Sequence, residues 1–472
     1  MNIVIVGAGE VGRSVAGTLA AEGHDVNLVE QNGEKAEQVA AELDVRVVRG
    51  NGARPQVLYD AGVREGCSVD LLVACTDRDE VNMLSCWIAR HAGVRRVISR
   101  VRGLEFTDSP TWGRDLGIDL MLSPERSVAR EILELLSVST AVRTAELLGG
   151  RAAIYAFRVA EESPLAGRSL KQIRIDHPSL VAIVVYVERA GTRADEKDED
   201  RKDEKNIVPD GDTVVRAGDL CYVVSYREQV WMLEKLFQLK TSRPLRKVFV
   251  VGGGKLGYQV AQRLQQEYGN VKIRLIDNDP QQCEKLANEL GKALILNGDG
   301  ADRALLLEEG IEEADGYVCA TASDEVNLIY AAIAKSLGVH KSIAVVRRRL
   351  YQDMPNHMPV DAVVDTNEAL AAMILRTIRY PGHTRALSII EKIDAEMLEV
   401  VLPENHNLTD IPLAELGLPK GVLVALLGRK DKVLVPTGAT RLQPGDHLIL
   451  FASTSLMREA VELFGEFDGT GP

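Results

Sequence analysis

The sequence predicts an α/β protein in which a doubly wound parallel sheet is followed by a small α+β lobe, and the pair then occurs a second time. Three observations predict this fold. One is a repeat with an offset of 245 residues, and another is the alternation of short apolar runs with amphipathic stretches. The third is a set of glycine-containing turns in two further segments, 167–226 and 408–452, which lack the alternation of strands and helices. Together they indicate two tandem copies of one domain pair.

The repeat is visible in three pairs of matching segments. Two of the pairs keep the same offset over about seventy positions, and the third differs from it by a few residues, which indicates an internal duplication. The pairs are IVIVGAGEVG (3–12) with VFVVGGGKLG (248–257), TDRDEVN (76–82) with TASDEVN (321–327), and GNGA (50–53) with GDGA (298–301). The last pair places Asn51 opposite Asp299.

Short apolar runs in the first copy predict the strands of a parallel sheet. They lie at 3–6, 26–29, 45–48, 71–74 and 96–99. Helix-like segments such as 12–21 and 80–91 separate them, and this alternation is typical of parallel β-α units.

The second kind of segment predicts a small antiparallel α+β lobe in each copy, within 167–226 and 408–452. Tight reversals are indicated by Asp210-Gly211, 217–219, Thr437-Gly438 and 444–446. The first lobe carries a charged segment at 193–205, which we interpret as a solvated loop extension, with a partner-contact arm as the alternative. With a linker at 241–244, the expected domains are 1–125, 126–240, 245–370 and 371–468.

Composition excludes several classes of protein. The 472 residues carry a formal net charge of −13, which disfavours binding to a nucleic-acid backbone. The six cysteines form no C-x-x-C pair, so neither a zinc site nor a disulfide framework is indicated. The N-terminus has no signal-peptide pattern and no apolar run is long enough to span a membrane, so we expect a cytoplasmic protein.

The clearest chemical signal is a G-x-G-x-x-G turn formed by Gly7, Gly9 and Gly12, directly after a strand and at the start of a helix. Such glycines let the backbone approach a pyrophosphate, whose charge is favoured at the helix N-terminus. Glu30 ends the next strand and can accept hydrogen bonds from both ribose hydroxyls. Because the same carboxylate repels a 2′-phosphate, we expect a Rossmann-like NAD(H) site, the alternative being glycines that only tighten the turn.

The second copy repeats the pattern with Gly252, Gly254 and Gly257, and Asp277 ends its next strand. Lys255 stands where the first copy has Glu10. If the lysine turns inward it favours extra phosphate charge, and if it turns outward it is a surface residue. A degenerate, empty second pocket is the further alternative.

Thr76-Asp77 and Thr321-Ala322 follow the fourth strand of each copy, at the rim where open α/β sheets bind ligands. A threonine hydroxyl there can reach cofactor oxygens. The alternative is a role at the helix N-terminus, where Asp77 or Ser323 could also cap the helix. No H-E-x-x-H, G-x-S-x-G or G-x-x-x-x-G-K-[ST] motif occurs, so the sequence indicates no catalytic apparatus.

Taken over nearly the whole chain, these motifs resemble the TrkA family, the peripheral subunits of Trk-type potassium uptake systems, built from tandem RCK (regulator of K⁺ conductance) domains. The segments that carry the likeness are IVIVGAGEVG, RVVRGNGARPQVLYDAG, ACTDRDEVNML, RVISRVR, VVGGGKLG, NGDGADRALL, TASDEVNLI, LAGRSL and VRAGD. The resemblance implies NAD(H) binding in the first unit and adenine nucleotide (ATP or ADP) or NAD binding in the second. It also implies a homo-tetrameric ring on the inner face of the membrane, under a potassium-translocating partner of Trk type.

The cofactor-binding residues expected from motif and resemblance come from both copies. They are Gly7, Ala8, Gly9, Glu10, Val11, Glu30, Asn51, Thr76, Asp77 and Arg100, and then Gly252, Gly253, Gly254, Lys255, Leu256, Asp277, Asp299, Thr321 and Ala322. Arg100 has no basic counterpart, since Val345 lies 245 positions on, and we therefore expect two unequal pockets. Two other functions remain open: an NAD-dependent dehydrogenase with a duplicated cofactor domain, and a dinucleotide sensor with a partner outside transport.

Overall fold

The computed structural model describes residues 1–66, 68–103, 106, 110–189, 206–238, 244–352, 354–380, 387–390, 395–403, 406–419 and 421–464. The charged segment 193–205 and most of the expected linker at 241–244 lie outside these residues. The chain forms two compact units: one contains 1–132 and 246–379, and the other contains 133–245 and 380–471.

The first sheet is parallel throughout and has the strand order β3-β2-β1-β4-β5-β6, which confirms the expected doubly wound fold. Its strands are β1 (Asn2–Val6), β2 (Asp25–Glu30), β3 (Arg46–Arg49), β4 (Leu71–Ala74), β5 (Arg96–Arg100) and β6 (Leu120–Leu122). The helices are α1 (Glu10–Ala21), α2 (Gly33–Glu42), α3 (Pro55–Asp60), α4 (Asp79–His91), α6 (Pro110–Asp115) and α7 (Pro124–Ser137). The short strand β6 was not predicted.

The second sheet repeats this topology as β14-β13-β12-β15-β16-β17, again parallel. Its strands are β12 (Lys247–Val251), β13 (Lys272–Asp277), β14 (Ala293–Asn297), β15 (Gly316–Cys319), β16 (Lys341–Val346) and β17 (Ala362–Asp365). The helices are α11 (Lys255–Glu267), α12 (Pro280–Glu289), α13 (Arg303–Glu308), α14 (Asp324–Ser336) and α15 (Thr366–Arg379).

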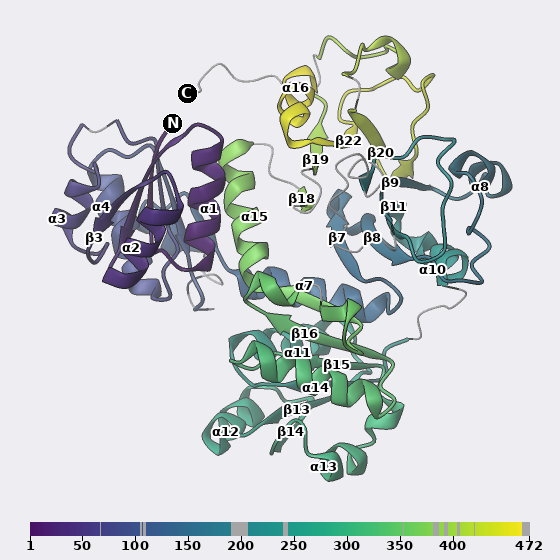
Figure 1. Ribbon diagram of the computed structural model, residues 1–472, viewed down its shortest axis with the longest axis horizontal. Coiled ribbons are helices and arrows are strands. Elements are labelled where there is room, and N and C mark those ends of the chain that lie inside the picture. The colour runs from purple at the N-terminus through teal and green to yellow at the C-terminus, as the bar shows by residue number, and fades with distance from the viewer. Residues whose placement is uncertain are drawn as a thin grey trace. The chain divides into compact units, whose positions relative to one another are not determined.

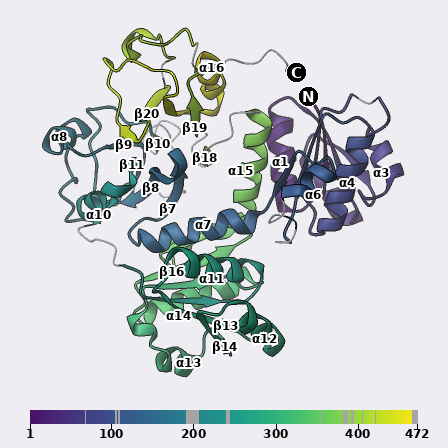
Figure 2. The same cartoon turned by 180° about the vertical axis from the view of Figure 1, so that it is seen from behind.

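Helix α15 continues from the second sheet but packs on the first. Both views show it beside α1 (Figure 1, Figure 2). Arg379 pairs with Glu22 just beyond α1, and an Arg96 guanidinium nitrogen donates to the carbonyl of Thr377 at 2.9 Å. Residues of the second half therefore form part of the first half's surface.

Two antiparallel sheets make up the second compact unit, as expected for the lobes. Their orders are β10-β9-β11-β8-β7 and β18-β19-β22-β20-β21. The first contains β7 (Arg143–Leu147), β8 (Ala152–Arg158), β9 (Ala182–Glu188), β10 (Asn206–Ile207) and β11 (Leu220–Tyr226), with α8 (Leu170–Asp176) and α10 (Val230–Gln238). The second contains β18 (Leu387–Ile390), β19 (Ala395–Val401), β20 (Leu423–Arg429), β21 (Lys432–Leu434) and β22 (His447–Ser453), with α16 (Thr454–Phe464).

The two lobes share one hydrophobic core. Ile154 and Ala156 of β8 lie in the same buried cluster as Ile449 and Phe451 of β22. Across this contact the backbone N–H of Leu148 donates to Glu399 at 3.2 Å. Each sheet also packs against a separate hydrophobic core on its other face. The central strands, β11 and β22, are therefore buried on both faces.

The glycine-aspartate turns in the lobes have a structural explanation. Gly218 and Gly445 have φ values of 83° and 76°, a region that favours glycine. The aspartate after each is buried and bonded to an arginine, Asp219 to Arg189 and Asp446 to Arg429. Among the described residues, no helix is both long and apolar enough to cross a membrane.

Candidate nucleotide-binding site

A cavity of about 670 Å³ is lined by residues from the carboxyl ends of both parallel sheets. Of the residues expected from the sequence, it is lined by Gly7, Gly9, Glu10, Val11, Glu30, Asn51, Thr76, Asp77 and Arg100, and also by Gly254, Lys255, Leu256, Thr321 and Ala322. Ala8, Gly252, Gly253, Asp277 and Asp299 do not line it. The structure thus brings most of the expected residues of both copies to one cavity.

The three glycines of the first turn have different structural roles. Gly7 has a φ of 108°, which a side chain would strain. A Cβ on Gly12 would lie 1.9 Å from the carbonyl oxygen of Gly7, so this position packs the helix on the strand. A Cβ on Gly9 would have no atom within 4 Å, and this residue precedes α1 without a side-chain cap. The first N–H groups of α1 are therefore available to an anion in the cavity.

Glu30 supports the glycine turn from the end of β2. Its two carboxylate oxygens accept from the backbone N–H groups of Ala8 and Asn32, both at 2.7 Å. Asp277 does the same in the second copy, accepting from Gly253 at 2.6 Å and Asp279 at 2.8 Å. Each oxygen keeps a second lone pair for a ligand hydroxyl.

Thr76 is held by Asn82, a fully buried residue of α4. The Thr76 hydroxyl and backbone N–H donate to Asn82 Oδ1 at 2.7 and 2.9 Å, and Asn82 Nδ2 donates to the carbonyl of Arg100 at 3.0 Å. Thr321 and Asn327 repeat the same bonds. Because the Thr76 hydroxyl donates its hydrogen bond to Asn82, it stabilises the rim of the cavity. The sequence pattern did not predict this role.

The N-cap expectation is correct for Ser323 and wrong for Asp77. Ser323 Oγ accepts from the N–H of Val326 at 3.3 Å at the start of α14. The N-cap residue of α4 is Arg78, which makes no side-chain cap. Asp77, whose side chain is 86% exposed, instead lies 3.5 Å from Arg100.

Arg100 is the one cation among the residues expected in the first copy, and it is largely buried. Its side chain is 12% exposed, and its Nε has no hydrogen-bond partner in the described structure. A buried donor without a partner is unfavourable, so this nitrogen favours a ligand acceptor. The nearby thiol of Cys75 stays neutral, because burial raises its pKa to about 12.

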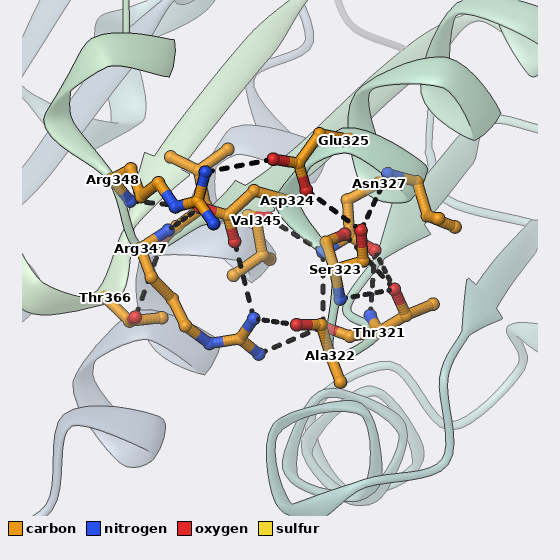
Figure 3. Close-up of polar contacts among 12 residues, drawn as sticks. Thr321, Ala322, Ser323, Asp324, Glu325, Asn327, Val345, Arg347, Arg348 and Thr366 are labelled. Carbon is orange, nitrogen blue, oxygen red and sulfur yellow. Dashed lines mark hydrogen bonds and ion pairs between the residues drawn. The ribbon is translucent and has the colours of Figure 1, made fainter.

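The rim of the second copy carries a different cation, Arg347 (Figure 3). Its guanidinium donates to the carbonyls of Ala322 at 2.7 Å and Thr321 at 3.0 Å. Next to it Arg348 pairs with Glu325 at 3.1 Å, and the pKa of Glu325 is lowered to about 2, chiefly by the hydroxyl of Tyr351.

Arg347 and its counterpart Arg102 were missed by the sequence reasoning. Both backbone N–H groups bond to an aspartate at the start of the preceding helix, Asp79 or Asp324. Arg102, however, directs its Nε to Glu125 at 3.1 Å. The signal available was the repeat itself, since both arginines keep the 245-residue offset.

Asn51 and Asp299 stabilise turns in the two copies. Asn51 Oδ1 accepts from the N–H of Ala53 at 2.9 Å. Asp299 accepts from Ala301 and from the hydroxyl of Tyr330 at 2.6 Å, and these bonds lower its pKa, with the Tyr330 bond the larger cause. Within the described residues, no cluster of histidine, cysteine and acidic side chains is arranged to hold a metal ion.

Comparison with protein families matches both halves of the chain. The TrkA-N domain matches residues 3–124 and 248–366, and the TrkA-C domain matches 154–238 and 397–465. The Trk system potassium uptake protein TrkA homolog 1 of Methanosarcina mazei is 32% identical over 98% of this chain and 100% of its own length. TrkA of Haemophilus influenzae is 29% identical over 96% of each chain.

Solved structures show the same fold. The alignment with a structure of the GsuK RCK domain covers 98% of this chain and 94% of the GsuK chain, with a TM-score of 0.60 and 19% sequence identity. The alignment with a structure described as the GsuK channel bound to NAD covers 98% of this chain and 78% of the channel chain, also with a TM-score of 0.60. With two TrkA-N and two TrkA-C domains in alternation, the chain belongs to the TrkA family of Trk-system potassium uptake proteins.

Proposed function

We propose that this chain is a nucleotide-sensing regulatory subunit of a Trk-type potassium uptake system, binding NAD(H) in its first half and ATP or ADP in its second. The observation that supports it best is the first glycine turn, where an uncapped helix, an open Gly9 and the anchored Glu30 face one cavity.

The first half has the groups that a dinucleotide without a 2′-phosphate requires. The N-terminus of α1 suits the pyrophosphate, and Glu30 suits the ribose diol while repelling a further phosphate. The partnerless Nε of Arg100 supplies a donor for a ligand oxygen. These features support NAD(H) over NADP(H).

The second half has a more cationic rim. Lys255 replaces Glu10 at the start of the helix, Ala322 replaces Asp77, and Arg347, which follows β16, donates to the carbonyl of Ala322. A cluster of positive charge favours a ligand with additional phosphate groups. This difference supports ATP or ADP in the second half.

The remaining parts of the proposal concern partners. Relatives along the full length of the chain are named potassium uptake proteins, which supports a membrane partner that carries potassium. On this proposal the chain lies on the inner face of the membrane as a homo-tetrameric ring and catalyses no reaction. Nucleotide binding then acts through its different affinity for two ring states, typically about 1–3 kcal/mol per site.

The test is potassium or rubidium flux in vesicles that contain the chain and its candidate transporter. We expect flux to change with NADH, NAD⁺, ATP or ADP in the wild type and to lose its NADH response in Gly9→Asp. Flux that ignores every nucleotide, in a complex shown to be intact, contradicts the regulatory role. Substrate-dependent oxidation of NADH that disappears in Gly9→Asp would instead establish the dehydrogenase alternative.

A further inference from the structure

A second cavity, of about 760 Å³, lies on the other side of the N-terminus of α7 from the nucleotide cavity. Ser123, Arg126 and Ser127 line it, whereas Pro124 and Glu125 line the nucleotide cavity. Met373 of α15 forms part of the wall, and its sulfur lies 3.4 Å from the hydroxyl of Ser127. The cavity therefore lies where the helix from the second half meets the first half.

Ser123 has a buried hydroxyl that bonds to none of the described residues. It immediately precedes α7, is 6% exposed, and its Oγ has no hydrogen-bond partner in the described structure. The first turn of a helix also leaves backbone N–H groups without partners inside the helix. The cavity wall therefore carries an unpartnered hydroxyl at the start of a helix, where the helix dipole also favours an anion.

The charged groups of the cavity favour an anion. Among the described residues that line it are three arginines, Arg90, Arg114 and Arg126, and one carboxylate, Asp119. Arg90 pairs with Asp119, and this carboxylate also accepts from the N–H of Val97 at 2.7 Å. The described part of the wall therefore carries more positive than negative charge beside the helix N-terminus.

The rest of the wall is apolar. Ile118, Leu120, Met121 and Met373 line the cavity with the polar groups. Its volume falls in the range of small-molecule sites, which combine apolar walls with a few polar groups. A bare ion would leave these apolar side chains unused.

From these contacts we propose that the cavity binds a phosphate group, carried on a small molecule with an apolar body, and that its occupancy is coupled to the nucleotide cavity. The coupling follows the start of α7, because Glu125 there accepts from Arg102 at the rim of the nucleotide site. A phosphate that orders Ser123 and Arg126 on one side of this turn also orders Glu125 on the other. By linkage, phosphate and nucleotide must then change each other's affinity by the same factor. This inference stands whether or not the chain regulates a transporter.

The test uses calorimetry on the full chain saturated with NADH and ATP, with phenyl phosphate and inorganic phosphate as the titrants. We expect wild type to bind phenyl phosphate more tightly than inorganic phosphate. Arg126→Glu and Ser123→Asp, which each place a carboxylate at the cavity, should weaken binding at least tenfold. Aspartate is a favoured residue before a helix, so Ser123→Asp should fold. Arg130→Glu, one turn along α7 and outside the cavity wall, is the matched control and should bind as wild type does.

A second measurement tests the coupling. The Kd of NADH should shift when phenyl phosphate is added to wild type or Arg130→Glu, and should stay constant in Arg126→Glu. Equal binding of the two titrants would contradict the apolar body and assign the site to free phosphate. Wild type that binds neither at millimolar concentration, or variants that all bind alike, would overturn the proposal.

Discussion

Glu30 both holds the glycine turn and faces the expected ribose, so its replacement tests the first site most directly. We expect Glu30→Ala to weaken NADH at least tenfold, since a hydrogen bond to a charged group contributes about 1.5–3 kcal/mol. Glu30→Gln keeps one acceptor oxygen and should lose less. Calorimetry on the wild type should show preference for NADH over NADPH, and equal affinities would refute the assignment.

A substitution at Gly9 can test ligand binding without disturbing the fold. A Cβ there meets no atom within 4 Å and the φ of −69° suits any residue, so Gly9→Asp should keep the wild-type Tm. Its carboxylate would occupy the place of the pyrophosphate, and NADH binding should fall more than tenfold. Gly254→Asp is the matched variant in the second copy and should spare NADH while weakening ATP. If both variants lose both ligands, the two sites are not separate.

At the scale of single residues, the sequence predicted those features that depend on backbone conformation and on spacing along the chain. Glycine turns and the acid at the end of the next strand follow from local rules, and both were found where expected. The hydrogen-bond partners of the rim arginines could not be predicted from the sequence. Arg102 and Arg347 hold equivalent backbone positions, yet their side chains bond to different partners. Their difference arises from residues brought together only by the fold.

Among the elements, α4 and α14 each stabilise the rim through one buried asparagine. Asn82 joins the turn after β4 to the end of β5, so Asn82→Ala leaves the N–H of Thr76 and the carbonyl of Arg100 without this partner. Each such loss costs about 1–3 kcal/mol. We expect a lower Tm together with weaker NADH binding. Asn327→Ala should lower the Tm to a similar extent and leave NADH binding intact, and the opposite pattern would contradict the role of Asn82 at the first site.

The order of the elements was largely predictable, and the gaps have physical reasons. The first five strands of the parallel sheet follow from apolar runs bounded by turns. Strand β6 is apolar but has only three residues, two of them half-buried, so it is shorter than the four-residue runs from which the other strands were predicted. The packing of α15 on α1 could not be predicted, since an amphipathic pattern shows that a helix has a buried face and not which surface covers it.

For the whole molecule, the shared core of the lobes predicts how fragments behave. Residues 1–240 alone would expose the face of β8 that carries Ile154 and Ala156, which in the full chain packs with the second lobe. We expect this fragment to self-associate and to recover a soluble heterodimer when produced together with residues 244–472. Size-exclusion chromatography with light scattering measures both. A monodisperse monomer of 1–240 would show that the shared core contributes little.

The shared core also constrains how the protein is made. Strand β11 ends at residue 226 and its partner surface is complete only when β22 has been synthesised to residue 453. At roughly 5–20 residues per second, the first lobe waits on the order of 10–45 s on the ribosome with an apolar face uncovered. During that interval the second lobe of the same chain cannot cover this face. Because both lobes belong to one chain, the order of translation decides which surface the first lobe can meet before its own partner is made.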